Sequence, residues 1–135
     1  MEYRKVLVDT SVIIDYLRKT KKEESIFWKV INNYDCVISV VTIFELYSGA
    51  KNQQHSEAID KVISFLEILS FDTPQAKLAS KIFKILKEKN KLIEFRDIFI
   101  ASCAISENIP LVTLNDNHFK RIEDLVLLTN RGIVK

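Results

Sequence analysis

The chain has 135 residues, of which 47% are hydrophobic and 28% are charged, a composition typical of one globular domain rather than of a disordered or membrane-spanning chain. The net charge of +2, from 20 Lys and Arg against 18 Asp and Glu, does not by itself indicate a nucleic-acid or membrane partner. Because the sequence has only two glycines, Gly49 and Gly132, it contains no Gly-rich phosphate-binding loop.

Targeting and cysteine patterns favour a cytoplasmic location. The N-terminal segment lacks the apolar run of a signal peptide, and no stretch approaches the apolar length that crosses a bilayer. Cys36 and Cys103 lie in apolar stretches without a CxxC pair, so we expect both to be buried and reduced. We therefore expect a cytoplasmic protein without a membrane partner, folded as a single domain over residues 1–135.

Short apolar strands and amphipathic helices alternate along the first half of the chain. The β-branched run at 5–8 predicts a buried strand that ends at Asp9, and the apolar spacing after it predicts a helix over 11–18. The next expected elements are a helix around 26–31, a strand at 36–39, a helix from 41 to about 51 and a helix over 55–66.

The second half continues this alternation. A strand at 68–71 leads into a long helix from Pro74 to about 90, since proline suits the first turn of a helix. Asp97 is expected to start the next helix, and a strand at 111–114, a polar turn at 115–117 and a strand at 126–128 follow. Strands separated by helices indicate a parallel sheet, because each parallel return needs a crossover. We predict a three-layer α/β/α domain with a central, mostly parallel sheet of four to five strands.

Four acidic residues are expected at the carboxyl edge of this sheet. Asp9 ends the first strand and Asp116 follows the fourth, while Glu45 and Asp97 lie in the early turns of helices that begin near the same edge. Carboxylates held close together repel one another and raise one another's pKa values, and a divalent cation relieves that cost. Hard oxygen ligands without a His or Cys set favour Mg²⁺ or Mn²⁺ over zinc.

Each acidic residue also has a purely local explanation. Asp9 and Asp97 could be helix N-caps, worth about 1 kcal/mol each. Glu45 could form a capping box with Thr42, and Asp116, which lies between two asparagines, could stabilise an Asx-turn.

Four segments carry a family resemblance that covers essentially the whole chain. They are VDTSVIIDYL at 8–17, SVVTIFEL at 39–46, DIFIA at 97–101 and LVTLNDNHF at 111–119. In this order they resemble the four motifs of PIN-domain nucleases, and the match is closest to the VapC-type toxins of toxin–antitoxin operons.

The resemblance implies a metal-dependent endoribonuclease that hydrolyses RNA phosphodiester bonds with a metal-activated water and is held inactive by a cognate antitoxin protein. It implies a homodimer, Mg²⁺ or Mn²⁺ as cofactor, and four catalytic residues, Asp9, Glu45, Asp97 and Asp116. Asp9 and Asp97 would be the principal metal ligands, and Glu45 with either Asp116 or Asn115 would hold the ion or its waters. Thr10, Ser11 and Thr113 would hydrogen-bond the carboxylates or the substrate phosphate, or would serve only as cap and strand residues.

Two alternatives belong to other functional classes. One is a catalytically inactive RNA-binding or partner-binding module of the same fold. The other is a HAD-like phosphatase, which also begins with an apolar strand ending in Asp but needs a second Asp where this chain has Ser11. The sequence does not identify the residues that bind RNA, the RNA that is cleaved, or the antitoxin.

Overall fold

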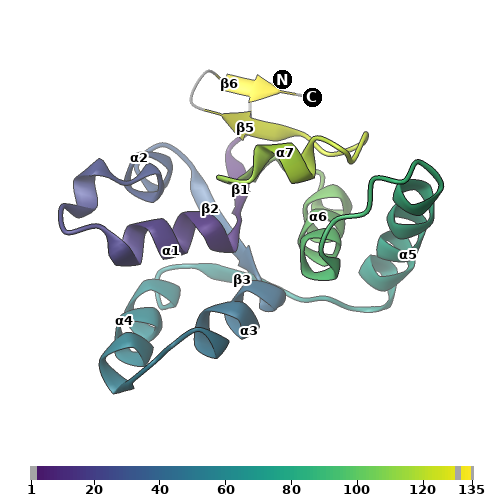
Figure 1. Cartoon of the computed structure of the whole chain (residues 1–135). Coiled ribbons are helices and arrows are strands. Elements are labelled where there is room, and N and C mark those ends of the chain that lie inside the picture. Colours follow the sequence, from purple (N-terminus) through teal and green to yellow (C-terminus); the bar gives the residue numbers. More distant parts are fainter. Residues whose placement is uncertain (1–2, 130–131, 135) are drawn as a thin grey trace.

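A computed structural model describes residues 3–129 and 132–134. They form one sheet in the order β3-β2-β1-β4-β5-β6, in which the first five strands are parallel and β6 runs antiparallel to β5. The strands are β1 (Lys5–Val8), β2 (Asp35–Ser39), β3 (Glu67–Leu69), β4 (Leu111–Val112), β5 (Leu127–Thr129) and β6 (Gly132–Val134). Figure 1 shows β1 in the middle of the molecule, with helices on both sides.

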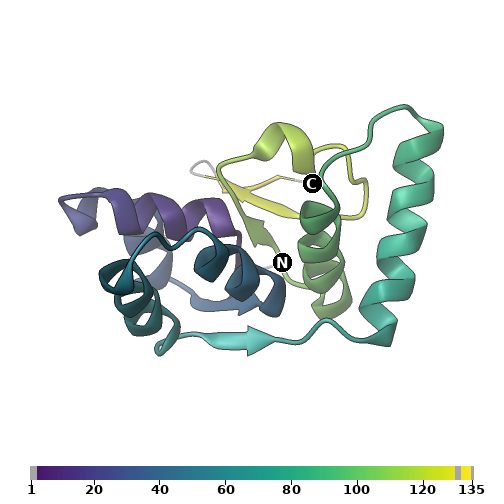
Figure 2. The ribbon, with the colours of Figure 1, turned by 60° about the horizontal axis from the view of Figure 1, so that its bottom comes forward.

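Helices cover both faces of the sheet, which confirms the predicted three-layer arrangement. They are α1 (Thr10–Arg18), α2 (Ile26–Ile31), α3 (Val40–Ser48), α4 (Gln53–Ile63), α5 (Thr73–Glu88), α6 (Phe95–Glu107) and α7 (Asp116–Phe119), with a short 3-10 helix at Lys22–Glu24. Figure 2 shows α1, α3 and α4 grouped together, away from the pair formed by α5 and α6.

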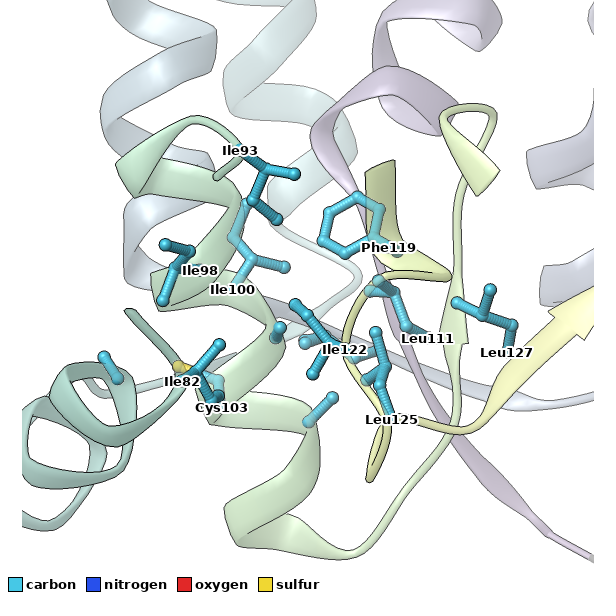
Figure 3. Close-up of a cluster of buried hydrophobic side chains, with 14 of the residues drawn as sticks. Ile82, Ile93, Ile98, Ile100, Cys103, Leu111, Phe119, Ile122, Leu125 and Leu127 are labelled. Carbon is cyan, nitrogen blue, oxygen red and sulfur yellow. The ribbon is translucent and has the colours of Figure 1, made fainter. Parts of the chain in front are cut away.

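The two cores lie on opposite faces because successive strand residues point to opposite sides. Val6 and Val8 of β1 pack with α1 to α4, whereas Leu7 between them packs with α5, α6 and α7. Figure 3 shows the second of these cores, where Phe119 and Leu111 face the side chains of α6. Both strand faces are therefore apolar, and polar groups are confined to the strand ends.

The order of the strands creates a crevice at the carboxyl end of β1. After β1 the chain adds β2 and β3 on one side, and it then returns to add β4 and β5 on the other. In open parallel sheets this reversal separates the loops that leave neighbouring strands, and ligands bind there. Here β1 is followed by α1, and β4 is followed by α7.

The structure differs from the sequence-based expectations in three places. The sheet gains a sixth strand, β6, at residues that were left without a prediction. The expected polar turn at 115–117 is instead the start of α7, and α6 begins at Phe95, two residues before Asp97. Cys36 and Cys103 are buried and free, as predicted. None of the helices among the described residues is long and apolar enough to cross a membrane.

Candidate active site

Asp9 lies at the junction of β1 and α1 and is almost fully buried, with 2% of its surface exposed. It occupies the N-cap position of α1, yet its side chain makes no capping hydrogen bond. Instead Oδ2 accepts hydrogen bonds from Ser11 Oγ at 2.8 Å and from Thr113 Oγ1 at 2.7 Å. Thr113 directly follows β4, so this pair of bonds joins the ends of the two strands that flank the crevice.

The two hydroxyls that bind Asp9 are themselves held in place by backbone amides. Leu114 N–H donates to Ser11 Oγ at 3.1 Å, and Asn115 N–H donates to Thr113 Oγ1 at 2.9 Å. Because each hydroxyl oxygen already accepts from an amide, its single proton is directed to the carboxylate. Both bonds end on Oδ2, and no described residue donates to Asp9 Oδ1, which leaves that oxygen available to a ligand.

Glu45 reaches the same edge from α3. Thr10 Oγ1 donates to Glu45 Oε1 at 2.8 Å, and Thr10 Oγ1 also hydrogen-bonds Thr42 Oγ1 at 2.9 Å. Thr10 and Thr42 are buried, so the position of the Glu45 carboxylate is set from within the protein. Arg96 Nε lies 3.8 Å from the other carboxylate oxygen, Oε2.

Asp97 completes a group of three neighbouring carboxylates. It lies in the first turn of α6, and 16% of its side chain is exposed. Burial raises the pKa of Asp97, and the negative charges of Asp9 and Glu45 raise it further, to about 6. The imidazole of His118, whose Nδ1 lies 3.7 Å from Asp97 Oδ2, acts in the opposite direction. Asp9 and Glu45 are therefore both close enough to Asp97 to oppose its ionisation in the protein alone.

The local explanations for three of these acids are wrong. Asp9 makes no cap bond, and Asp97 is the third residue of α6 rather than its cap. The cap of α3 is Ser39, whose hydroxyl accepts from Val41 N–H, so Glu45 takes no part in a capping box. Capping therefore does not account for the convergence of these carboxylates.

Asp116 and Asn115 lie at the start of α7, with Asp116 partly buried and Asn115 exposed. The Asx-turn expected for Asp116 is replaced by this helix, in which Asp116 is the first residue and Asn115 makes no side-chain cap bond. Unlike Asp9 and Glu45, Asp116 is not among the charges that raise the pKa of Asp97. The choice between Asn115 and Asp116 as the fourth polar ligand stays open.

Two basic side chains reach this site that the motifs did not predict. Arg96 contacts Glu45, and its guanidinium also lies 3.8 Å from Glu94 Oε1. The side chain of His118 is half exposed and lies beside Asp97. The available signal was their place in the chain, since Arg96 directly precedes Asp97 and His118 is the third residue of α7.

The donor set of this site fits a hard divalent cation. Among the described residues, no group of three or more His, Cys, Asp or Glu side chains is arranged so that it could hold a metal ion by itself. Mg²⁺ does not require one, since it is bound by one or two carboxylates and keeps several waters. Asp9 offers an oxygen without a hydrogen-bond partner among the described residues, and the raised pKa of Asp97 reports the negative charge that a cation would neutralise.

Comparisons with known proteins agree with this architecture. The chain matches the PIN domain over residues 6–125. It is 34% identical over 126 residues to Ribonuclease VapC1 of Methanocaldococcus jannaschii, covering 93% of this chain and 87% of that protein. It is 32% identical over 132 residues to Ribonuclease VapC of Rickettsia bellii, covering 92% and 95% of the two chains.

Solved structures give the same result. The chain resembles VapBC2 from Rickettsia felis, which was solved bound to a DNA fragment from the VapBC2 promoter. The TM-score is 0.79 and the identity is 27%, with coverage of 91% of this chain and 96% of that one. For VapBC-1 from nontypeable Haemophilus influenzae the TM-score is 0.75, with 28% identity and coverage of 90% and 94%. With a parallel sheet, acidic residues at its carboxyl edge and a domain match over most of its length, the chain belongs to the PIN-domain family.

Proposed function

We propose that the chain is a Mg²⁺- or Mn²⁺-dependent endoribonuclease and the toxin of a toxin–antitoxin pair. The observation that carries this proposal is the group formed by Asp9, Glu45 and Asp97, in which burial and then the charges of Asp9 and Glu45 raise the pKa of Asp97 to about 6. The similarity to proteins named Ribonuclease VapC supports RNA as the substrate class.

In this mechanism Asp9 and Asp97 hold the ion, and Glu45 with Asn115 or Asp116 holds the ion or its waters. When bound, the ion activates a water for attack on the phosphodiester and stabilises the charge that develops. Ser11 and Thr113 fix Asp9 Oδ2 through two hydrogen bonds and so hold the carboxylate in one orientation, in which Asp9 would bind the ion. Thr10 fixes Glu45 in the same way.

The test is cleavage of a labelled single-stranded or structured RNA by the purified protein. We expect cleavage in Mg²⁺ or Mn²⁺, none in EDTA, and none with Asp9→Asn or Asp97→Asn. Cleavage that persists undiminished in EDTA would refute the metal mechanism. RNA binding without cleavage in any divalent ion would instead support the inactive binding module.

The phosphatase alternative is disfavoured by the site itself. Where that class needs a second Asp, this chain has Ser11, whose hydroxyl is committed to Asp9 and accepts from a backbone amide. Failure to hydrolyse a small phosphomonoester under conditions that cleave RNA would complete the distinction.

We propose that the antitoxin docks in an apolar groove between α1, α2 and α4. The groove has a volume of about 410 Å³, with Trp28 and Phe65, 44% and 74% exposed, on its lining and Lys22 and Lys61 at its sides. The solved neighbours are VapBC complexes, and an amphipathic segment with acidic flanks would match this lining. Phe65→Glu should abolish co-purification with the protein encoded by the adjacent gene and leave RNA cleavage intact.

We also propose a homodimer. Val40 and Phe44, one turn apart on α3, are 43% and 60% exposed, and Phe95 at the start of α6 is 59% exposed. Phe27 is not part of this exposed apolar surface, because it belongs to the core and packs edge-on against Tyr16. The cytoplasmic location stays a prediction.

A further inference from the structure

Two grooves lie along α1; one is lined by Ser11, which is bonded to Asp9, and the other by Glu45. One, of about 500 Å³, is lined by Ser11 and Asn115 at its inner end and by Asp15, Arg18 and Lys19 farther along α1. The other, of about 260 Å³, is lined by Glu45 and lies between α1, α3 and α4. Figures 1 and 2 show α1 running outward from the end of β1, next to α3 and α4.

Ile14 and Arg18 line both grooves. With Ser11 they occupy positions 11, 14 and 18 of one helix, a spacing that places them in a row on one face. Ser11 is bonded to Asp9, so this row begins at the site and ends at Arg18, about 10 Å away along the helix axis at 1.5 Å per residue. Ile14 is an apolar residue shared by the linings of the two grooves.

Among the described residues along these grooves, Arg18 and Lys51 are cations whose side chains have no protein partner, and of the two only Arg18 lines both grooves. Asp15 is paired with Lys19, whose Nζ lies 3.6 Å from Asp15 Oδ1, and Glu45 is paired with Arg96. Arg18 is exposed and forms no ion pair or side-chain hydrogen bond with any described residue. On the far side of the second groove, Lys51 and His55 add basic groups, and Lys51 N–H donates to His55 Nδ1.

We propose that the substrate strand crosses α1 over Ile14, and that Arg18 binds a phosphate near the one that is cleaved. An exposed arginine can bind a phosphate through two parallel hydrogen bonds. A base can lie against an apolar surface such as Ile14 without its sequence being read. The lysines of α5, at 77, 81 and 84, are exposed on a helix that lines neither groove and do not serve this strand. This inference rests on the proposed ribonuclease function.

The test compares Arg18→Gln with Arg4→Gln. Arg4 lies before β1, at the amino edge of the sheet, and pairs with Asp35, so its replacement changes the net charge equally at a distant place. Cleavage of a mixed-sequence single-stranded RNA in Mg²⁺ gives kcat and KM. Anisotropy of the same labelled RNA in EDTA gives binding as a function of salt, without hydrolysis. Thermal melting confirms that each variant is folded.

Arg18→Gln should raise KM about tenfold, the loss expected for one charged hydrogen-bonded contact, with kcat little changed. The slope of log affinity against log salt should become shallower by about 0.7, the value for one phosphate contact on a single strand. Arg18→Lys should recover part of both effects, and Arg4→Gln should change neither.

Equal effects of Arg18→Gln and Arg4→Gln would overturn the proposal, because the contribution of Arg18 would then be one of net charge only. An unchanged KM and salt slope in Arg18→Gln would also overturn it, and would leave the grooves to a protein segment such as the antitoxin. In both cases wild-type cleavage would show that the proposed ribonuclease function stands. If the wild type neither cleaves nor binds RNA, that function fails, and this proposal fails with it.

Discussion

Replacing Asp97 with Asn should stabilise the metal-free protein at neutral pH. Asn keeps the size of the side chain and removes the charge that burial, Asp9 and Glu45 oppose. The folded-state pKa of about 6 lies above the ordinary value of 3.8, so the folded protein holds more protons than the unfolded chain between these values. The contribution of Asp97 to the stability of the wild type is therefore lost as the pH rises from about 4 to about 6.

The size of the effect follows from the pKa. A rise from 3.8 to about 6 corresponds to about 3 kcal/mol of unfavourable free energy for the ionised form, at about 1.4 kcal/mol per unit. We take this as an upper bound, because Asn also loses the charge interaction with His118. A gain of about 1 to 3 kcal/mol should raise the melting temperature at pH 8 in EDTA by about 3 to 10 °C for a chain of this length.

The assay is thermal melting in EDTA at pH 4 and pH 8, followed by a Mg²⁺ titration at pH 8. Asp97→Asn should exceed the wild type at pH 8 and match it near pH 4, where the wild-type carboxyl is protonated. Mg²⁺ should stabilise the wild type through ligand linkage and the variant little, and RNA cleavage should be lost. As a control, Asp124→Asn, at an exposed position before β5, should leave the melting temperature within about 1 °C of the wild type.

Equal Mg²⁺ shifts in the wild type and Asp97→Asn, with cleavage retained, would refute the role of Asp97 as a metal ligand. A variant less stable than the wild type by the same amount at both pH values would refute the argument from charge crowding.

Three further changes test other parts of the structure. Thr113→Val removes one hydrogen bond to Asp9 Oδ2, while Asp9 keeps its bond from Ser11. The Mg²⁺ affinity measured by calorimetry should fall about 10- to 100-fold. An unchanged affinity would contradict the role of Thr113 in orienting Asp9. Phe44 is 60% exposed, and Phe44→Glu should give a monomer by sedimentation at tens of micromolar, where the wild type is expected to be a dimer. A wild type that sediments as a monomer would count against the homodimer. Phe119→Ala, at a fully buried position, should lower the free energy of unfolding by about 3 to 5 kcal/mol in urea titrations, and a loss below 1 kcal/mol would show that the site collapses around the cavity.

The fold class and the edge of the sheet where the acidic residues gather follow from local sequence patterns. The apolar residues 6–8 are fully buried in a strand, and helical spacing between such runs requires parallel crossovers. Asp9 and Thr113 directly follow β1 and β4, so their proximity follows from strand order once the sheet is parallel. Local rules were weakest at short elements, where the expected turn at 115–117 is instead α7 and β6 had no predicted counterpart.

The bonds that hold the acidic residues depend on contacts between distant elements. Sequence offered capping for Asp9 and Glu45 because N-cap and capping-box patterns are local, whereas the bonds from Thr113 to Asp9 and from Thr10 to Glu45 span 104 and 35 residues. The approach of Arg96 to Glu45 joins two helices and has no sequence period. Residue propensity and spacing report on neighbours along one strand or helix. Contacts between elements depend instead on the helix positions, which are set by the two cores on opposite faces of the sheet. Those positions arise only when the whole chain packs.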